Sequence, residues 1–247
     1  MCERRFAGAG TGTNAFTMLT FGQCTRFRLA PPMQSRVTMT PMRMFVALPL
    51  PEMAKEHLAE YLEPRQEAVS SELSLRWTVP EQWHLTLAFL PEVADRHADE
   101  LLERLGRAAS RRDPLVLRVA GAGAFPHAGH AKVLYAGLEH GLEHDGEHDG
   151  EHEELARLAT LAHKVRAAAA KSGIEVGGGR FRPHLTLARL RRPADVTRWL
   201  RALDPYAGPS WQAREVALIA SYLGQGPKGR PRYEFRETFE LGPPSIG

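Results

Sequence analysis

The sequence has few cysteines and no long apolar segment. Of its 247 residues two are cysteines, Cys2 and Cys24, so the chain beyond them can form neither a disulfide nor a thiolate metal site. This favours a reducing compartment. No apolar run approaches the roughly 18 residues that cross a bilayer, and the first forty positions have no apolar signal-peptide core. We therefore expect a cytoplasmic protein with no membrane segment.

Residues 1–41 lack the hydrophobic periodicity of a helix or strand. They are rich in Gly, Thr, Arg and Pro, and Pro31, Pro32 and Pro41 punctuate their end. We interpret them as a disordered tail or as the result of a mis-assigned start. The folded part is expected to be a single domain over residues 42–247.

A seven-residue stretch occurs twice, one hundred residues apart. Residues 84–90 read HLTLAFL and residues 184–190 read HLTLARL, so six of seven positions match. Chance would give such a match in only about 3% of chains of this composition, which favours an internal duplication. In an extended strand alternate side chains share a face. The histidine and threonine of each copy would then face one side. Leu85, Leu87 and Phe89, with Leu185 and Leu187 in the second copy, would face the other.

The paired polar side chains suit acid–base chemistry at an anion. An unperturbed imidazole titrates at about 6.5 and can hold or release a proton near neutral pH. A threonine hydroxyl on the same face can donate a hydrogen bond to an anionic oxygen. Two copies related by a pseudo-twofold axis would place His84 and His184 on opposite sides of one small anion, with Thr86 and Thr186 between them. A tetrahedral phosphate fits this arrangement.

Two His-x-Thr pairs with these flanking residues resemble the 2H phosphoesterase superfamily. Within it the chain is most similar to the bacterial RNA 2′,3′-cyclic phosphodiesterases, also called 2′-5′ RNA ligases. The resemblance spans residues 42 to 241 and also rests on four flanking segments: 42–48, 76–80, 181–183 and 223–233. It implies two pseudo-symmetric lobes whose antiparallel sheets line a central cleft, with helices on the outside. The order of strands and helices, without strict βαβ alternation, independently favours an α+β fold.

The resemblance also implies a reaction. The expected function is hydrolysis of 2′,3′-cyclic phosphate ends of RNA or nucleotides to 2′-phosphomonoesters. His84 would be the general acid and His184 the general base, while Thr86 and Thr186 would hold the phosphate oxygens. We expect no metal and no other cofactor, because these four groups already supply proton transfer and charge stabilisation.

Four more residues are possible substrate contacts: Phe45, Arg182, Arg189 and Tyr233. The two arginines belong to a cluster around the second motif, a basic rim that would attract a polyanion such as RNA. The alternative is an ordinary solvated surface. Arg189 lies at an odd offset from His184, so in a regular strand it would face away from Thr186. It would reach a phosphate only if the strand bends or ends there.

Charge is segregated along the chain, although the formal net charge is only +3. Residues 139–154 contain eight acids and no Lys or Arg, so the rest carries +11. Within this region residues 137–152 form four His-ending tetrapeptides, GLEH twice and DGEH twice. Repeated glycines oppose a helix that would align the histidines for a metal. We predict a low-complexity solvated loop there.

The sequence leaves several alternative hypotheses open. The same site could run in reverse and join a cyclic end to a 5′-hydroxyl, or the protein could bind RNA without catalysis. Both histidines could also merely satisfy hydrogen bonds in the core. Trp83 could stack on a base or pack in the core. The partner is expected to be an RNA end or a cyclic nucleotide, with a monomer as the default; the physiological substrate is undetermined.

Overall fold

The computed structural model describes residues 41–68, 75–140 and 149–242, all within one compact unit, Met39–Gly247. The tail predicted over residues 1–41 lies outside the described residues except for Pro41.

The described residues form nine strands, four α-helices and four short 3-10 turns. The strands are β1 (Met42–Pro49), β2 (Leu75–Trp77), β3 (His84–Val93), β4 (Leu115–Phe125), β5 (Ala131–His140), β6 (Leu185–Ala194), β7 (Ala207–Ala213), β8 (Glu215–Tyr222) and β9 (Arg232–Glu240). The helices are α1 (Glu52–Ala68), α2 (Ala98–Ala109), α3 (Asp149–Lys171) and α4 (Thr197–Leu203). The 3-10 turns are η1 (Pro80–Gln82), η2 (Asp95–His97), η3 (Ala128–His130) and η4 (Pro227–Gly229).

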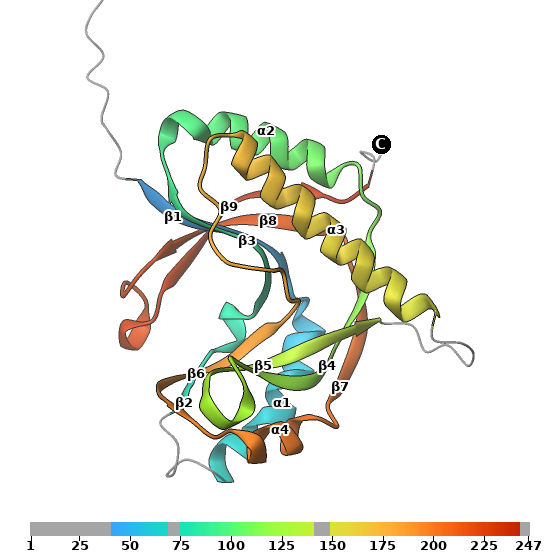
Figure 1. The fold of residues 1–247 in the computed structure, drawn as a ribbon, viewed down its shortest axis with the longest axis vertical. Coiled ribbons are helices and arrows are strands. Elements are labelled where there is room, and N and C mark those ends of the chain that lie inside the picture. The colour runs from blue at the N-terminus through green and yellow to red at the C-terminus, as the bar shows by residue number, and fades with distance from the viewer. Residues whose placement is uncertain (1–40, 69–74, 141–148, 243–247) are drawn as a thin grey trace, which may run out of the picture. The chain divides into compact units, whose positions relative to one another are not determined.

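The strands of the described chain belong to one curled antiparallel sheet (Figure 1). Its order is β7-β4-β5-β6-β3-β1-β8-β9, with β2 paired to β6. The first half of the sheet comprises β3, β1, β8 and β9, and the second half comprises β6, β5, β4, β7 and β2. The halves meet where Leu85 of β3 lies opposite Leu185 of β6. The predicted α+β fold with two related lobes is confirmed, and the structure adds that the lobes share one sheet.

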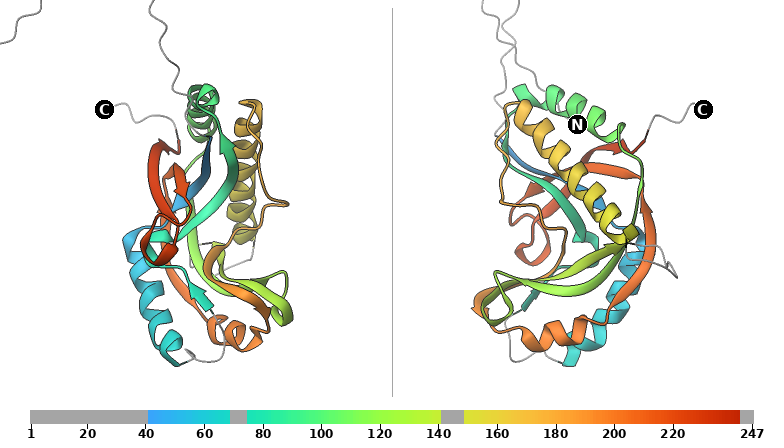
Figure 2. Two further views of the ribbon diagram at one scale, coloured as in Figure 1. Left: turned by 90° about the vertical axis from the view of Figure 1, so that its left-hand side faces the viewer. Right: turned by 45° about the vertical axis from the view of Figure 1, so that its right-hand side comes forward.

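Helices cover the outer faces of this sheet (Figure 2). Helix α3 packs on β3, β4 and β5, α2 packs beside α3 and on β9, while α1 contacts β7 and α4 contacts β4. The leucines of both motif copies enter this core: Leu85, Leu87, Leu185 and Leu187 are each 1% exposed. Among the described helices none has the length and apolar character needed to span a bilayer.

Both motif strands contain a β-bulge at the same position. In the pairing of β3 with β1, the partners jump from Ala88 to Thr86 and skip Leu87. In the pairing of β6 with β5 they jump from Ala188 to Thr186 and skip Leu187. A bulge inserts one residue and reverses the alternation of side chains beyond it. The prediction that Phe89 shares a face with the leucines is therefore wrong.

The low-complexity loop is shorter than predicted. Residues 137–140 continue β5 and residues 149–152 begin α3, while residues 141–148 lie outside the described part. Strand β5 extends because its residues up to His140 pair with β4 as far as Leu117. The glycine stretch at 177–179 is held at one end, where the Gly177 N–H donates to the Phe89 carbonyl over 2.8 Å.

Candidate active site

The two His-x-Thr pairs face one hollow between the halves of the sheet. Its volume is about 210 Å³, and it is lined by Arg76, Trp77, Thr78, Gln82, His84, Thr86, His184, Thr186, Arg189, Arg230, Pro231 and Tyr233. Because Leu85 pairs with Leu185, the two motif copies are related by a local twofold axis at that point. This register brings the two pairs together, although they are one hundred residues apart in the chain.

Each histidine is held by the same backbone hydrogen bond. The Nδ1–H of His84 donates to the Gln82 carbonyl over 2.7 Å, and that of His184 donates to the Arg182 carbonyl over 2.8 Å. A carbonyl oxygen only accepts, so the neutral ring must carry its proton on Nδ1. The Nε2 lone pair of each ring is left available for proton transfer.

Aromatic rings support both imidazoles, but in different arrangements. His84 stacks on Phe45, with centroids 4.4 Å apart and planes inclined by 21°, and Tyr233 meets it edge-on at 5.5 Å. His184 has edge contacts with Phe125 at 5.0 Å and with Tyr135 at 5.4 Å. The rings fix the orientation of each imidazole beyond what its hydrogen bond achieves.

The pKa of each histidine is lowered in the folded protein. Burial is the main cause for His84, whose pKa falls from 6.5 to about 4; the hydrogen bond to Gln82 opposes this fall, and the charges of His184 and Arg189 add to it. Burial also lowers the pKa of His184, again against its backbone hydrogen bond and with help from Arg189. Both rings are thus neutral at pH 7, and a bound anion would raise their proton affinity.

Arg189 lines the hollow, although in a regular strand it would face away. The bulge at Leu187 supplies the bend: it puts Arg189 on the same face as Thr186. The positive charge of Arg189 influences His84, His184 and Tyr233, which places its guanidinium within electrostatic reach of all three. A cation at this position can hold a phosphate oxygen.

The other predicted substrate contacts lie in different settings. Tyr233 lines the hollow, and partial burial raises the pKa of its phenol, so it is a neutral donor at pH 7. Phe45 is only 3% exposed and lies against the His84 ring, so it supports the histidine and does not line the hollow. Arg182 supplies its carbonyl to His184, while its guanidinium lies 6.0 Å from the centroid of the Phe125 ring, outside the lining residues.

Sequence reasoning missed two arginines that line the hollow, Arg76 and Arg230. Each donates to a backbone carbonyl across the hollow: Arg76 to Gly229 over 3.0 Å and Arg230 to Trp77 over 3.3 Å. Both lie in segments that carried the family resemblance, but no periodicity indicated which side chains turn inward. Trp83, by contrast, is 4% exposed, which confirms packing over base stacking.

The sequence of the chain is similar to those of known proteins. A family model described as LigT-like phosphoesterase matches residues 48–135 and 151–228. The RNA 2′,3′-cyclic phosphodiesterase of Thermus thermophilus is 32% identical over 203 residues, which cover 81% of this chain and 90% of the relative. The protein of the same name from Archaeoglobus fulgidus is 28% identical over 200 residues, covering 81% of this chain and all of the relative.

Solved structures agree with these matches. The crystal structure of TT0787 from Thermus thermophilus superimposes with a TM-score of 0.61 at 29% identity, covering 82% of this chain and 100% of that one. The Escherichia coli LigT complexed with 3′-AMP gives a TM-score of 0.58 at 26% identity, covering 81% of this chain and 98% of that one.

Proposed function

The chain belongs to the LigT-like phosphoesterase family, and from this premise we propose that it hydrolyses 2′,3′-cyclic phosphate ends of RNA or of nucleotides. The product would be a 2′-phosphomonoester with a free 3′-hydroxyl. The observation that carries the proposal is the pair of imidazoles in one hollow, each with Nδ1 engaged and Nε2 available.

The reaction is an in-line displacement at phosphorus. His184 accepts a proton from water as its oxygen attacks, and the bond between phosphorus and O3′ breaks. His84 donates a proton to the departing O3′, so the proton count is balanced. In-line geometry requires the two groups on opposite sides of phosphorus, and the local twofold between the motif copies is suited to that requirement.

The remaining polar groups stabilise charge on the phosphate. Thr86 and Thr186 donate hydroxyl hydrogen bonds to the non-bridging oxygens, and Arg189 adds a charge-assisted hydrogen bond. The negative charge of the bound phosphate also raises the pKa of His84, so that this ring carries the proton its acid role requires. Proton transfer and charge stabilisation are both supplied by side chains of the protein.

The relatives support this substrate class. Two aligned over four-fifths of the chain are named RNA 2′,3′-cyclic phosphodiesterase. A structural neighbour was solved with 3′-AMP, a nucleotide phosphorylated on its ribose. The hollow of about 210 Å³ is smaller than the roughly 300 Å³ at which sites for drug-sized ligands begin. It suits the ribose phosphate end better than a whole oligonucleotide.

The test is product analysis with the full chain. Purified protein is given 2′,3′-cyclic mononucleotides and an RNA oligomer with a cyclic end, and the products are separated by chromatography against 2′- and 3′-phosphate standards. We expect the 2′-phosphate, at a rate unchanged by EDTA. A 3′-phosphate product would reverse the assignment of the leaving oxygen, and loss of activity in EDTA would refute the metal-free mechanism. The reverse reaction, which joins a cyclic end to a 5′-hydroxyl, is tested by adding an RNA with a 5′-hydroxyl. A longer RNA product would reveal it.

A further inference from the structure

A second hollow lies between α2 and α3, which pack against each other. Its volume is about 600 Å³, against about 210 Å³ for the hollow of the proposed active site. It lies on the opposite side of β3 from that site, because Leu85 and Leu87 turn into the core with α3 while His84 faces the other way. The two hollows are separate features.

The lining of this second hollow is basic. It consists of Arg104, Arg107, Ala108, Arg111, Arg112, His163, Lys164, Ala167, Ala168 and Lys171, and it includes no Asp or Glu. The side chains from α3 recur at a spacing of three to four residues, which places them on one face of the helix. Small alanine side chains leave the space between the two rows of cations open. We call this feature the α2–α3 groove.

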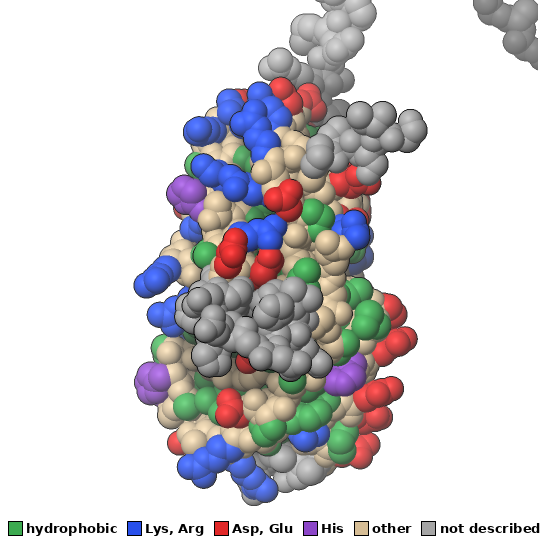
Figure 3. Space-filling view, turned by 90° about the vertical axis from the view of Figure 1, so that its right-hand side faces the viewer, with side chains coloured by type: hydrophobic (Ala, Val, Ile, Leu, Met, Phe, Trp, Pro, Cys, Tyr) green, Lys and Arg blue, Asp and Glu red, His purple; other side chains and the backbone are tan. Residues whose placement is uncertain are grey.

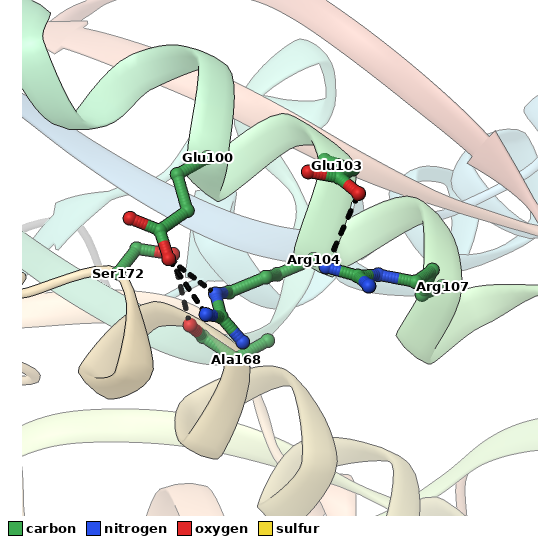
Figure 4. Close-up of polar contacts among 6 residues, drawn as sticks. All are labelled: Glu100, Glu103, Arg104, Arg107, Ala168 and Ser172. Atoms are coloured by element: carbon green, nitrogen blue, oxygen red, sulfur yellow. Dashed lines mark hydrogen bonds and ion pairs between the residues drawn. The ribbon is translucent and has the colours of Figure 1, made fainter.

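Most of the positive charge in the α2–α3 groove is not neutralised. Glu100 pairs with Arg104 over 2.6 Å, and Glu103 pairs with Arg107 over 3.3 Å (Figure 4). Within the described ranges, no ion pair is found for the other four: Arg111, Arg112, Lys164 and Lys171. The Nε of Arg112 is moreover buried without a hydrogen-bond partner in the described structure. A buried donor of this kind is costly unless a ligand satisfies it.

Figure 3 shows the side of the molecule that lies on the right in Figure 1. Lys and Arg side chains gather at its upper left, at the height at which α2 lies in Figure 1. Positive charge concentrated beside a hollow attracts a polyanion and is weakened by salt. The side chains lining the groove include no Phe, Tyr or Trp on which a base could stack.

We propose that the α2–α3 groove binds the phosphodiester backbone of RNA, away from the end that enters the active site. This inference rests on the proposed function for the choice of RNA as the polyanion. The basic row on α3 extends over residues 163–171, about 12 Å at 1.5 Å per residue, enough for a few consecutive phosphates. Binding is independent of base sequence, because the lining provides cations and no stacking surface.

The test combines a charge-reversed groove with a matched control. Arg111→Glu with Lys164→Glu changes two exposed groove cations, and Arg198→Glu with Arg201→Glu makes the same charge change at exposed positions of α4. Fluorescence anisotropy measures binding of an RNA of about 20 nucleotides that has ordinary hydroxyl ends, across a salt titration. We expect the groove variant to lose at least about 10-fold in affinity and the slope of log K against log salt to shrink by about 1.4, for two phosphate contacts. The α4 variant should stay within about twofold of wild type.

The outcomes separate this inference from the proposed function. Hydrolysis of a cyclic mononucleotide, which is too short to reach the groove, should be the same in wild type and groove variant. If the wild-type protein does not hydrolyse the cyclic mononucleotide at all, the proposed function is wrong. The anisotropy measurement would still show whether the groove binds RNA. Equal losses of RNA affinity in the groove and α4 variants, or no loss in the groove variant, would refute RNA binding by the groove. The proposal would also be refuted if the groove variant bound RNA normally but lost binding to phosphatidylserine vesicles, which present an anionic membrane surface. Should the groove variant not fold, Arg111→Ala with Lys164→Ala takes its place, with an expected loss of about threefold or more.

Discussion

The two copies of the seven-residue repeat share their backbone features but differ at one side chain. Both β3 and β6 carry the bulge after the threonine, and both histidines donate to the carbonyl two residues earlier. The one non-identical position of the repeat is Phe89 in β3 and Arg189 in β6. Through the bulge, both of these side chains turn to the face of the sheet that carries the histidines.

The side chains at this position do different things in the two halves. Phe89 packs against the cluster of Phe45, Ala47, Ala217 and Ile219, with the Arg43 guanidinium 4.5 Å from its ring centroid. Arg189 instead lines the hollow and lowers the pKa of both histidines. The single difference within the repeat thus places a cation in the hollow from β6 and an apolar ring beside the Phe45 cluster, outside the lining residues, from β3.

The largest effect should come from removing either imidazole. We predict that His84→Ala and His184→Ala each lower kcat at least about 100-fold, the usual size of a lost general acid or base. His130→Ala, at an exposed position between β4 and β5, is the control and should leave kcat unchanged. Single-turnover hydrolysis of a cyclic nucleotide measures the chemical step. Near-normal turnover in either variant would show that the two halves do not share the reaction.

A smaller effect is expected when the second copy of the motif is made like the first. Arg189→Phe should lower kcat/KM roughly 10- to 100-fold, because a hydrogen bond to a charged group contributes about 1.5 to 3 kcal/mol. The control, Arg192→Phe, changes an exposed arginine of the same strand that does not line the hollow. Steady-state kinetics with a cyclic mononucleotide would decide; equal values for the two variants would remove Arg189 from the site.

The sequence predicted the fold class and the paired motif well, because both depend on local patterns. The order of the elements indicated an α+β fold, and the repeat located the two His-x-Thr pairs and the strands β3 and β6. The bulges were missed, although they leave a mark in the hydrophobic pattern: the apolar positions change from odd to even numbers between Leu187 and Leu190. For this reason, the sequence left undecided which face of the sheet Arg189 turns to, and the face predicted for Phe89 was wrong.

Features that depend on contacts between distant residues were also out of reach of the sequence. Arg76 and Arg230 line the hollow through hydrogen bonds between segments about 150 residues apart. Phe45 was expected to contact the substrate, but its stack on His84 depends on how β1 pairs with β3. Strand β5 continues into the low-complexity region because its partner β4 is long, which the composition of that region does not reveal.

The pH dependence of kcat/KM provides a third comparison of the halves. Acid–base catalysis requires one ring protonated and one neutral, so kcat/KM falls about tenfold per pH unit below the lower pKa and above the higher one. Burial lowers both pKa values below 6.5, that of His84 to about 4. We therefore predict that kcat/KM is maximal below pH 6.5. A rate profile from about pH 4 to 8 measures it, and a maximum above pH 7 would contradict the assigned pair.

The smallest predicted effect is on stability in acid. It should depend on the buried His84 and not on an exposed histidine. The pKa of His84 is about 4 in the folded protein and 6.5 when exposed, so below pH 6.5 the unfolded chain binds the additional proton. Stability is then lost as the pH falls from 6.5 toward 4, by about 1 kcal/mol between roughly pH 7.5 and 5.5. His84→Phe keeps a ring on Phe45 without a titrating group, so it should reduce this loss, whereas His130→Phe should not. Urea unfolding at the two pH values measures the difference, and an identical loss in wild type and His84→Phe would show that His84 is not held neutral by burial.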